Sequence, residues 1–146
     1  MKNFYMPRIH ILLIDDSKTD LIMIKEAIIE RDITHTIDTA GNGIEAISFL
    51  KKEDAFNNKA TPNLILLDIN MPLMNGYEVL DIIKADKKLN HIPIVMFSTS
   101  SLPDDIFKSY QKHANCYIVK PDNARGFDEV VNSIESFWIN IAKLPS

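Results

Sequence analysis

Three aspartates and a lysine stand where apolar segments of this sequence end. Asp15 and Asp16 close one segment, Asp68 closes a second, and Lys120 closes a third. Three carboxylates gathered at one place repel one another strongly unless a cation lies among them. Carboxylate oxygens suit a hard cation, and Mg²⁺ prefers one or two carboxylates together with phosphate and water. The pattern therefore predicts a metal site, with Mg²⁺ as the first choice and Mn²⁺ as the second, that helps to bind an anion.

The elements that must position these residues follow from the hydrophobic pattern. Short apolar runs alternate with amphipathic segments of helical period, which is typical of a parallel sheet covered by helices. We place five strands near residues 9–14, 34–39, 63–67, 92–97 and 115–119. Five helices follow them, and we expect the last, with its stripe from Phe127 to Ile141, to cover one face of the sheet. The predicted fold class is α/β, a flavodoxin-like, doubly wound, five-stranded parallel sheet in the order 2-1-3-4-5.

This strand order would gather the charged residues at one edge of the sheet. Strand 1 lies beside strand 3, so Asp15 and Asp16 approach Asp68 across one interstrand step of roughly 4.8 Å. Ser98 ends the fourth strand on the other side of Asp68. Lys120 ends the fifth strand about 10 Å from the third, a gap that a long lysine stem can largely cover.

Composition and charge argue against several classes of protein. A chain of 146 residues, 46% hydrophobic and 25% charged, suits one soluble domain. The net charge is -4 and the basic residues are scattered, so we expect no direct nucleic-acid partner. The single cysteine, Cys116, excludes an internal disulfide, and no segment has the pattern of a secretory signal. No apolar run approaches the roughly 20 residues that span a bilayer. We expect a cytoplasmic protein without a membrane segment.

Along nearly its whole length the chain resembles the receiver domain of two-component response regulators. Five motifs at the expected strand ends carry the resemblance: Leu13–Asp16, Leu66–Pro72, Asn75–Gly76, Ile94–Ser98 and Val119–Pro121. The implied organisation is an N-terminal extension over residues 1–8, a receiver domain over 9–143 and no output domain. The chain is similar to stand-alone regulators, including those paired with phytochrome-type histidine kinases.

The resemblance implies a role for each acidic residue. Asp68 is the implied phosphoacceptor, which forms an aspartyl phosphate as carboxylate nucleophiles do. Asp15 and Asp16 are the implied Mg²⁺ ligands, directly or through water, and Asn70 is expected to add its backbone carbonyl. The phosphoryl group would come from a sensor histidine kinase or a histidine phosphotransfer protein. The protein is thus expected to be a signalling protein that catalyses only its own phosphorylation and dephosphorylation.

The resemblance also implies a switch. The Ser98 hydroxyl and the Lys120 ammonium would contact phosphoryl oxygens, and the Lys120–Pro121 peptide bond would be cis. Ser98 and Tyr117 are the implied coupled pair that changes the surface of the fourth helix, fifth strand and fifth helix. That surface would bind a downstream protein, which the sequence does not identify, or a second copy of the chain in a homodimer.

Simpler roles remain open for several residues. Asp16, followed by Ser17, could cap the first helix, and Ser98 could cap the fourth. Lys120 could be a solvated charge at a strand end, and Tyr117 an ordinary half-buried aromatic. At the level of function, the alternatives are a pseudo-receiver adaptor that works without phosphorylation and, less favoured, an aspartyl-phosphate-forming phosphatase. The phosphatase would normally carry its nucleophile on the first strand rather than at Asp68.

Overall fold

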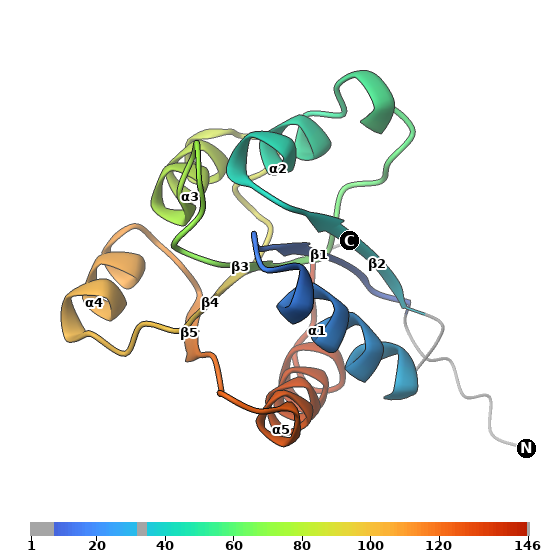
Figure 1. Cartoon of the computed structure of the whole chain (residues 1–146). Helices are drawn as coiled ribbons and strands as arrows, with labels where there is room; N and C mark the ends of the chain where they lie inside the picture. The colour runs from blue at the N-terminus through green and yellow to red at the C-terminus, as the bar shows by residue number, and fades with distance from the viewer. Residues whose placement is uncertain (1–7, 32–34, 146) are drawn as a thin grey trace, which may run out of the picture.

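Five parallel strands form the centre of the molecule. The computed structural model describes residues 8–31 and 35–145. The strands are β1 (His10–Ile14), β2 (Thr36–Ala40), β3 (Leu64–Leu67), β4 (Ile94–Ser98) and β5 (Cys116–Val119). They pair in the order β2-β1-β3-β4-β5, which confirms the predicted topology (Figure 1). The predicted strand positions agree with the structure to within one or two residues at each end.

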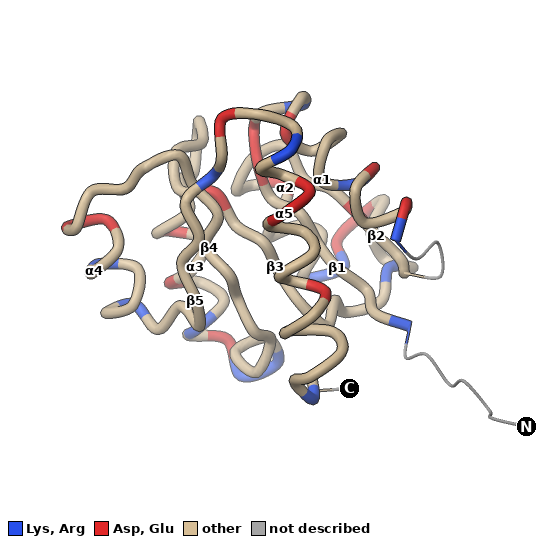
Figure 2. The backbone as a smooth tube through the Cα atoms, turned by 90° about the horizontal axis from the view of Figure 1, so that it is seen from below, with Lys and Arg blue, Asp and Glu red and all other residues tan. Residues whose placement is uncertain are grey.

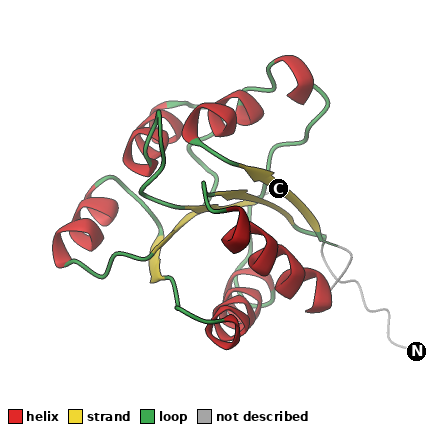
Figure 3. Cartoon of the chain, viewed as in Figure 1, coloured by secondary structure: helices red, strands yellow, loops and turns green. Residues whose placement is uncertain are grey.

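Helices cover both faces of the sheet. They are α1 (Lys18–Arg31), α2 (Gly43–Leu50), α3 (Gly76–Ala85), α4 (Pro103–Gln111) and α5 (Ala124–Ile134). The helices α2 and α3 lie on one face and α1 and α5 on the other, whereas α4 lies beside β5 at the edge (Figure 3). The predicted α/β class with five helices is therefore confirmed.

The central strands are apolar throughout because helices bury both of their faces. In β3, Ile65 and Leu67 pack into the core beneath α2 and α3. Leu64 and Leu66 point to the opposite side and pack into the core beneath α1 and α5. All four side chains are buried, so β3 is held rigidly between two hydrophobic layers. That rigidity fixes the position of the next residue, Asp68.

The C-terminal stripe departs from the prediction. A single π-helical turn, η2 (Glu135–Ile139), follows α5, and the Asn140 amide donates to the carbonyl of Glu135 at 3.0 Å. A bond five residues back adds one residue to the turn and rotates the last residues of the stripe about the helix axis. Ile139 is consequently buried, whereas Phe137 is 51% exposed and Ile141 is 69% exposed. The expectation that the stripe covers the sheet as far as Ile141 was wrong at this end.

The segment between α2 and β3 is more ordered than a plain surface loop. It contains a short 3₁₀ turn, η1 (Asp54–Phe56), and the Phe56 ring lies 5.4 Å from the Phe49 ring of α2. Lys and Arg are interspersed with Asp and Glu along the backbone in Figure 2. Within the described part of the chain, no helix has the length and apolar character needed to cross a membrane.

Candidate functional site

Backbone hydrogen bonds bring four strand ends to one edge of the sheet. The Asp68 amide donates to the Ile14 carbonyl at 2.9 Å, one residue beyond the end of β3. The Lys120 amide likewise donates to the Ser98 carbonyl at 2.7 Å, one residue beyond the end of β5. The ladder therefore places Asp68 beside the end of β1 and Lys120 beside the end of β4.

The three aspartates converge as the sequence predicted. Asp15, Asp16 and Asp68 each offer a carboxylate oxygen, and these oxygens all lie within 4.8 Å of one another. Asp15 and Asp68 are buried and Asp16 is exposed. An all-oxygen set with one exposed member fits a hard divalent cation such as Mg²⁺ or Mn²⁺, which keeps water or substrate oxygens among its ligands.

Burial makes these carboxylates costly to ionise. It raises the pKa of Asp68 to about 6, and the neighbouring charge of Asp15 adds to this rise, while Lys120 opposes both effects. Burial also raises the pKa of Asp15, against the bonds that this carboxylate accepts from Lys120 and from the Ser17 amide. Two carboxyl groups with raised pKa values beside a third carboxylate form a site that a divalent cation would stabilise.

Lys120 reaches the acidic cluster. Its side chain is 4% exposed, and its Nζ lies 2.5 Å from Asp15 Oδ2, 2.9 Å from Asp20 Oδ2 and 3.6 Å from Asp68 Oδ2. Burial by itself would lower the pKa of Lys120, but the bonds to Asp15 and Asp20 outweigh it, so the pKa is raised and the ammonium stays charged. The lysine thus spans the interstrand gap, and the alternative of a solvated strand-end charge is wrong.

The predicted cis bond is absent. No peptide bond among the described residues is cis, so Lys120–Pro121 is trans. A trans bond before proline is favoured by roughly 0.5–1 kcal/mol. Lys120 already reaches Asp15 with the trans bond, so its approach to the cluster does not require the cis isomer.

Ser98 and Tyr117 lie at the opposite side of Asp68 from β1. Ser98 is fully buried at the end of β4, and its hydroxyl accepts a hydrogen bond from the Ser100 amide at 3.3 Å. Tyr117 on β5 is half-buried, and its hydroxyl donates to the Ser100 carbonyl at 2.8 Å. Burial raises the pKa of Tyr117, and the hydroxyls of Ser98 and Ser100 oppose that rise. Both members of the predicted pair therefore contact the loop between β4 and α4.

The loop after Asp68 is shaped by a glycine. The Gly76 amide donates to the Ile69 carbonyl at 2.7 Å, and a Cβ at Gly76 would collide with the Asp68 carbonyl oxygen. Only glycine allows this close return of the chain. Asn70 is exposed two residues beyond Asp68. Its role as a carbonyl ligand stays a prediction.

The capping alternatives fail for two residues. Ser17, not Asp16, caps α1, because the Ser17 hydroxyl accepts from the Asp20 amide at 3.2 Å. The N-cap position of α4 is Leu102, where no side chain makes a capping bond, so Ser98 does not cap this helix. Asp16 and Ser98 are thus available for the site.

Sequence reasoning missed Asp20. This residue belongs to the first turn of α1, and its carboxylate contacts the Lys120 ammonium. The signal was its spacing, five residues after Asp15 and three after the capping Ser17, which turns it toward the strand ends.

The bond from the Tyr77 hydroxyl to Asp105 Oδ1, at 2.7 Å, joins α3 to α4 and was also missed. Nothing in the sequence indicates that long-range pair.

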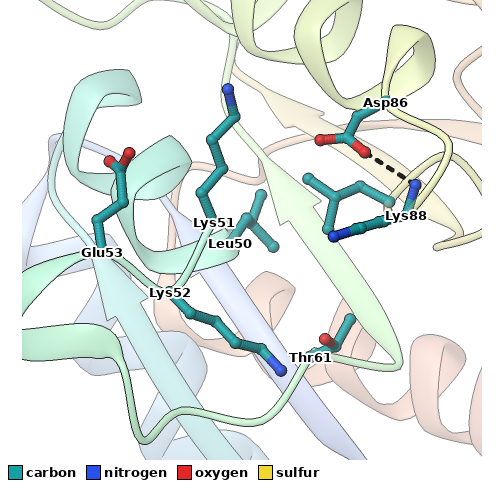
Figure 4. A pocket seen from close by; sticks show the side chains of 8 residues that line it. Leu50, Lys51, Lys52, Glu53, Thr61, Asp86 and Lys88 are labelled. Carbon is teal, nitrogen blue, oxygen red and sulfur yellow. Dashed lines mark hydrogen bonds between the residues drawn. The ribbon is translucent and has the colours of Figure 1, made fainter.

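A cleft of about 510 Å³ lies away from this edge, between the ends of α2 and α3 (Figure 4). Lys51, Lys52 and Lys88 line it together with Glu53 and Asp86, so its charges nearly balance. Asp86 is already engaged, since it accepts a bond from the Lys88 amide at 2.8 Å. The chemistry of the molecule is better sought at the buried aspartates than in this exposed cleft.

Comparison with known proteins identifies the class. The model of the response regulator receiver domain matches residues 11–132. The chain therefore belongs to the response regulator receiver family and is a signalling protein of two-component systems.

Three individual matches show which members of the family the chain resembles. Response regulator Rcp1 of Synechocystis is 40% identical over 136 residues, which cover 93% of this chain and 92% of Rcp1. The structure of the phosphorylated cyanobacterial phytochrome response regulator RcpA superposes with a TM-score of 0.91 at 43% identity, covering 96% of this chain and all of RcpA. The Mn²⁺-bound form of Rcp1 has a TM-score of 0.88 at 39% identity, covering 94% of this chain and 99% of Rcp1. The protein is thus similar to the regulators of phytochromes.

Proposed function

We propose that Asp68 accepts a phosphoryl group from a histidine kinase or a histidine phosphotransfer protein. One observation carries the proposal: three carboxylates converge within 4.8 Å, and Lys120 Nζ lies 3.6 Å from Asp68 Oδ2. A nucleophile beside a cluster that attracts a cation, with a fixed ammonium at hand, suits phosphoryl transfer. That phosphorylated RcpA is a close structural match supports the same role.

The reaction at Asp68 is a displacement at phosphorus. The ionised carboxylate forms a new P–O bond while the P–N bond of a phosphohistidine breaks. The bonding pair leaves with the imidazole nitrogen of the donor. Lys120 holds positive charge beside the oxygens of the transferred group, and its buried stem keeps the ammonium in place.

We propose that Asp15, Asp16 and Asp68, with the Asn70 carbonyl, hold Mg²⁺. A bound Mg²⁺ would neutralise the developing charge of the phosphoryl oxygens. Mn²⁺ is a fitting substitute, since it too prefers oxygen ligands and is the ion bound to Rcp1 in its solved structure. Of the three carboxylates, Asp16 is the exposed one.

Phosphorylation would act on the loop between β4 and α4. The new acceptor oxygens on Asp68 would draw the Ser98 hydroxyl away from the Ser100 amide. Ser100 in turn holds the Tyr117 hydroxyl through its carbonyl, so a shift of this loop reaches β5 directly. Ser98 and Tyr117 thereby form the switch pair. To convert a 1:99 equilibrium into 99:1, phosphorylation must favour the active state by about 5.5 kcal/mol.

The surface whose conformation would change on phosphorylation consists of α4, β5 and α5. It exposes three apolar side chains, Phe107, Tyr110 and Val119. We propose that it binds the downstream protein or a second copy of the chain. The likeness to phytochrome regulators favours a phytochrome-type kinase as the upstream partner.

Phosphorylation of the purified protein by acetyl phosphate or phosphoramidate tests the function. With Mg²⁺ present, intact-mass spectrometry should show one added phosphoryl group on the wild type and none on Asp68→Asn. Without the metal the wild type should be labelled far more slowly.

The same assay separates the alternatives. An unlabelled wild type that still binds partners through α4, β5 and α5 would indicate the pseudo-receiver adaptor. Sustained phosphate release from unrelated monoesters would indicate the phosphatase. Labelling of Asp68→Asn at the wild-type rate would place the phosphoacceptor elsewhere.

A further inference from the structure

Asp20 is a fourth carboxylate at this site, and it lies outside the metal cluster. It extends from the first turn of α1, the end of this helix that lies nearest the end of β1 (Figure 1). Its Oδ2 lies 2.9 Å from Lys120 Nζ, and its side chain is 22% exposed. The contact joins residues that are 100 positions apart in the chain.

The local structure of α1 directs Asp20 to the lysine. Asp20 is the third residue after the capping Ser17, and a carboxylate there commonly turns back to accept from the amide of the capping residue. Here the Ser17 amide already donates to Asp15 Oδ1 at 2.9 Å. The Asp20 carboxylate is thereby left to pair with Lys120.

Lys120 is consequently held between two partners that are nearer than the phosphoacceptor. Its Nζ is 2.5 Å from Asp15 and 2.9 Å from Asp20, against 3.6 Å from Asp68. An ammonium has three donors, and these two carboxylates occupy two of them. A phosphoryl group on Asp68 needs the same donors, because its oxygens carry the charge that the lysine neutralises.

We propose that Asp20 is a positioning residue that holds Lys120 back from Asp68 in the unphosphorylated protein and so weakens the binding of a phosphoryl group. This inference rests on the proposed function of Asp68. Of the two contacts to Lys120, the one from Asp20 breaks more easily, because the Asp20 side chain is 22% exposed to water whereas that of Asp15 is only 5% exposed. Any group that must displace Asp20 from the lysine binds less tightly by the free energy of that contact.

Binding of beryllofluoride, an analogue of the phosphoryl group, tests the proposal without a chemical step. We expect Asp20→Asn to bind beryllofluoride about 3- to 5-fold more tightly than the wild type at saturating Mg²⁺, toward the upper end of the range for one partly exposed ion pair. Fluorine NMR or calorimetry would measure the dissociation constant. Glu30→Gln is the matched control, because it removes one charge from an exposed position of the same helix. It should leave the constant unchanged.

A double-mutant cycle shows whether Asp20 acts through the lysine. In a Lys120→Met background, Asp20→Asn should change beryllofluoride binding less than twofold, because the competition has gone. A gain of the same size in both backgrounds would overturn the proposal, since it would be a simple effect of charge. Equal or weaker binding by Asp20→Asn in the wild-type background would also overturn it. A wild type that binds no beryllofluoride would instead overturn the proposed function of Asp68 and this inference with it.

Discussion

Asp68 is the residue at which stability and function conflict most directly. It is 6% exposed and stands beside Asp15, and its pKa is raised from 3.8 to about 6. Above pH 6 the Asp68 carboxyl group of the metal-free protein is therefore ionised, although burial and the charge of Asp15 both disfavour the ionised form. The proposed phosphorylation of Asp68 requires that ionised form, because the ionised carboxylate is the nucleophile.

The sign of this effect on stability follows from linkage. An acid whose pKa is higher in the folded protein stabilises folding while protonated, and this contribution is lost as pH rises through about 6. We expect Asp68→Asn, which cannot ionise, to raise the metal-free free energy of unfolding by up to about 3 kcal/mol at pH 7.5, the linkage value for a pKa raised from 3.8 to about 6. The advantage should vanish toward pH 4. Urea denaturation of both proteins across this range measures the difference, and a gain that is constant with pH would contradict the assignment.

Among the helices, α4 is the least anchored by apolar burial. Of its described residues only Ser109 is buried, while Phe107 and Tyr110 are about half exposed or more. Polar bonds hold it instead: Asp105 accepts from the Tyr77 hydroxyl at 2.7 Å and from the Ser100 hydroxyl at 2.5 Å. An element held by a few polar bonds can shift at low cost, which suits a reporting surface.

Removal of the bond between α3 and α4 tests this view of the helix. We expect Tyr77→Phe to lower the free energy of unfolding by about 1–2 kcal/mol, because a partly buried hydrogen bond to a carboxylate is lost. Amide hydrogen exchange in α4 should accelerate more than exchange in α3, which has its own capping box of Asn75 and Glu78.

Phe107→Leu is the control for that experiment. Its side chain is 68% exposed, so the change alters α4 without breaking a bond to α3. It should leave hydrogen exchange nearly unchanged. Equal acceleration over the whole chain in Tyr77→Phe would show general destabilisation rather than release of α4.

At the scale of the whole molecule, the proposed metal site would couple folding to metal binding. The carboxylates come together only when β1 and β3 are paired, so a cation that bridges them binds the folded chain and not the unfolded one. Ligands of that kind stabilise the whole fold by mass action.

We therefore expect Mg²⁺ to raise the melting temperature. At a concentration 100 times the dissociation constant, the stabilisation is about 2.7 kcal/mol, or roughly 5–10 °C for a chain of this size. The gain should be smaller at pH 5 than at pH 7.5, since the metal must displace a proton from Asp68 below its pKa of about 6. Scanning calorimetry at matched ionic strength measures both effects.

Two variants distinguish specific binding from screening of charge. Asp16→Asn changes an exposed member of the cluster and should reduce the gain from Mg²⁺. Asp86→Asn changes a carboxylate in the cleft between α2 and α3 and should retain the full gain. Equal gains in both variants would mean that the metal does not bind at the aspartate cluster.

Much of the protein was determined by the sequence itself. Five runs of strand length, three of them closed by charged residues, predict the sheet, its order and the convergence of Asp15, Asp16 and Asp68, because parallel strands that share helix-covered faces end at one edge. The lysine could be assigned to the same edge from its place after β5.

Tertiary structure alone decided the rest. Four features depend on where side chains or single turns lie in space. They are the Asp20 contact with Lys120, the bond between Tyr77 and Asp105, the trans Lys120–Pro121 bond, and the exposure of Ile141 beyond the π-helical turn. Such contacts join residues far apart in the chain, and differences of a few kcal/mol among packing alternatives select them. The hydrophobic periodicity of a segment does not depend on those differences. It does indicate which residues of each strand and helix are buried, and that burial pattern determines the sheet.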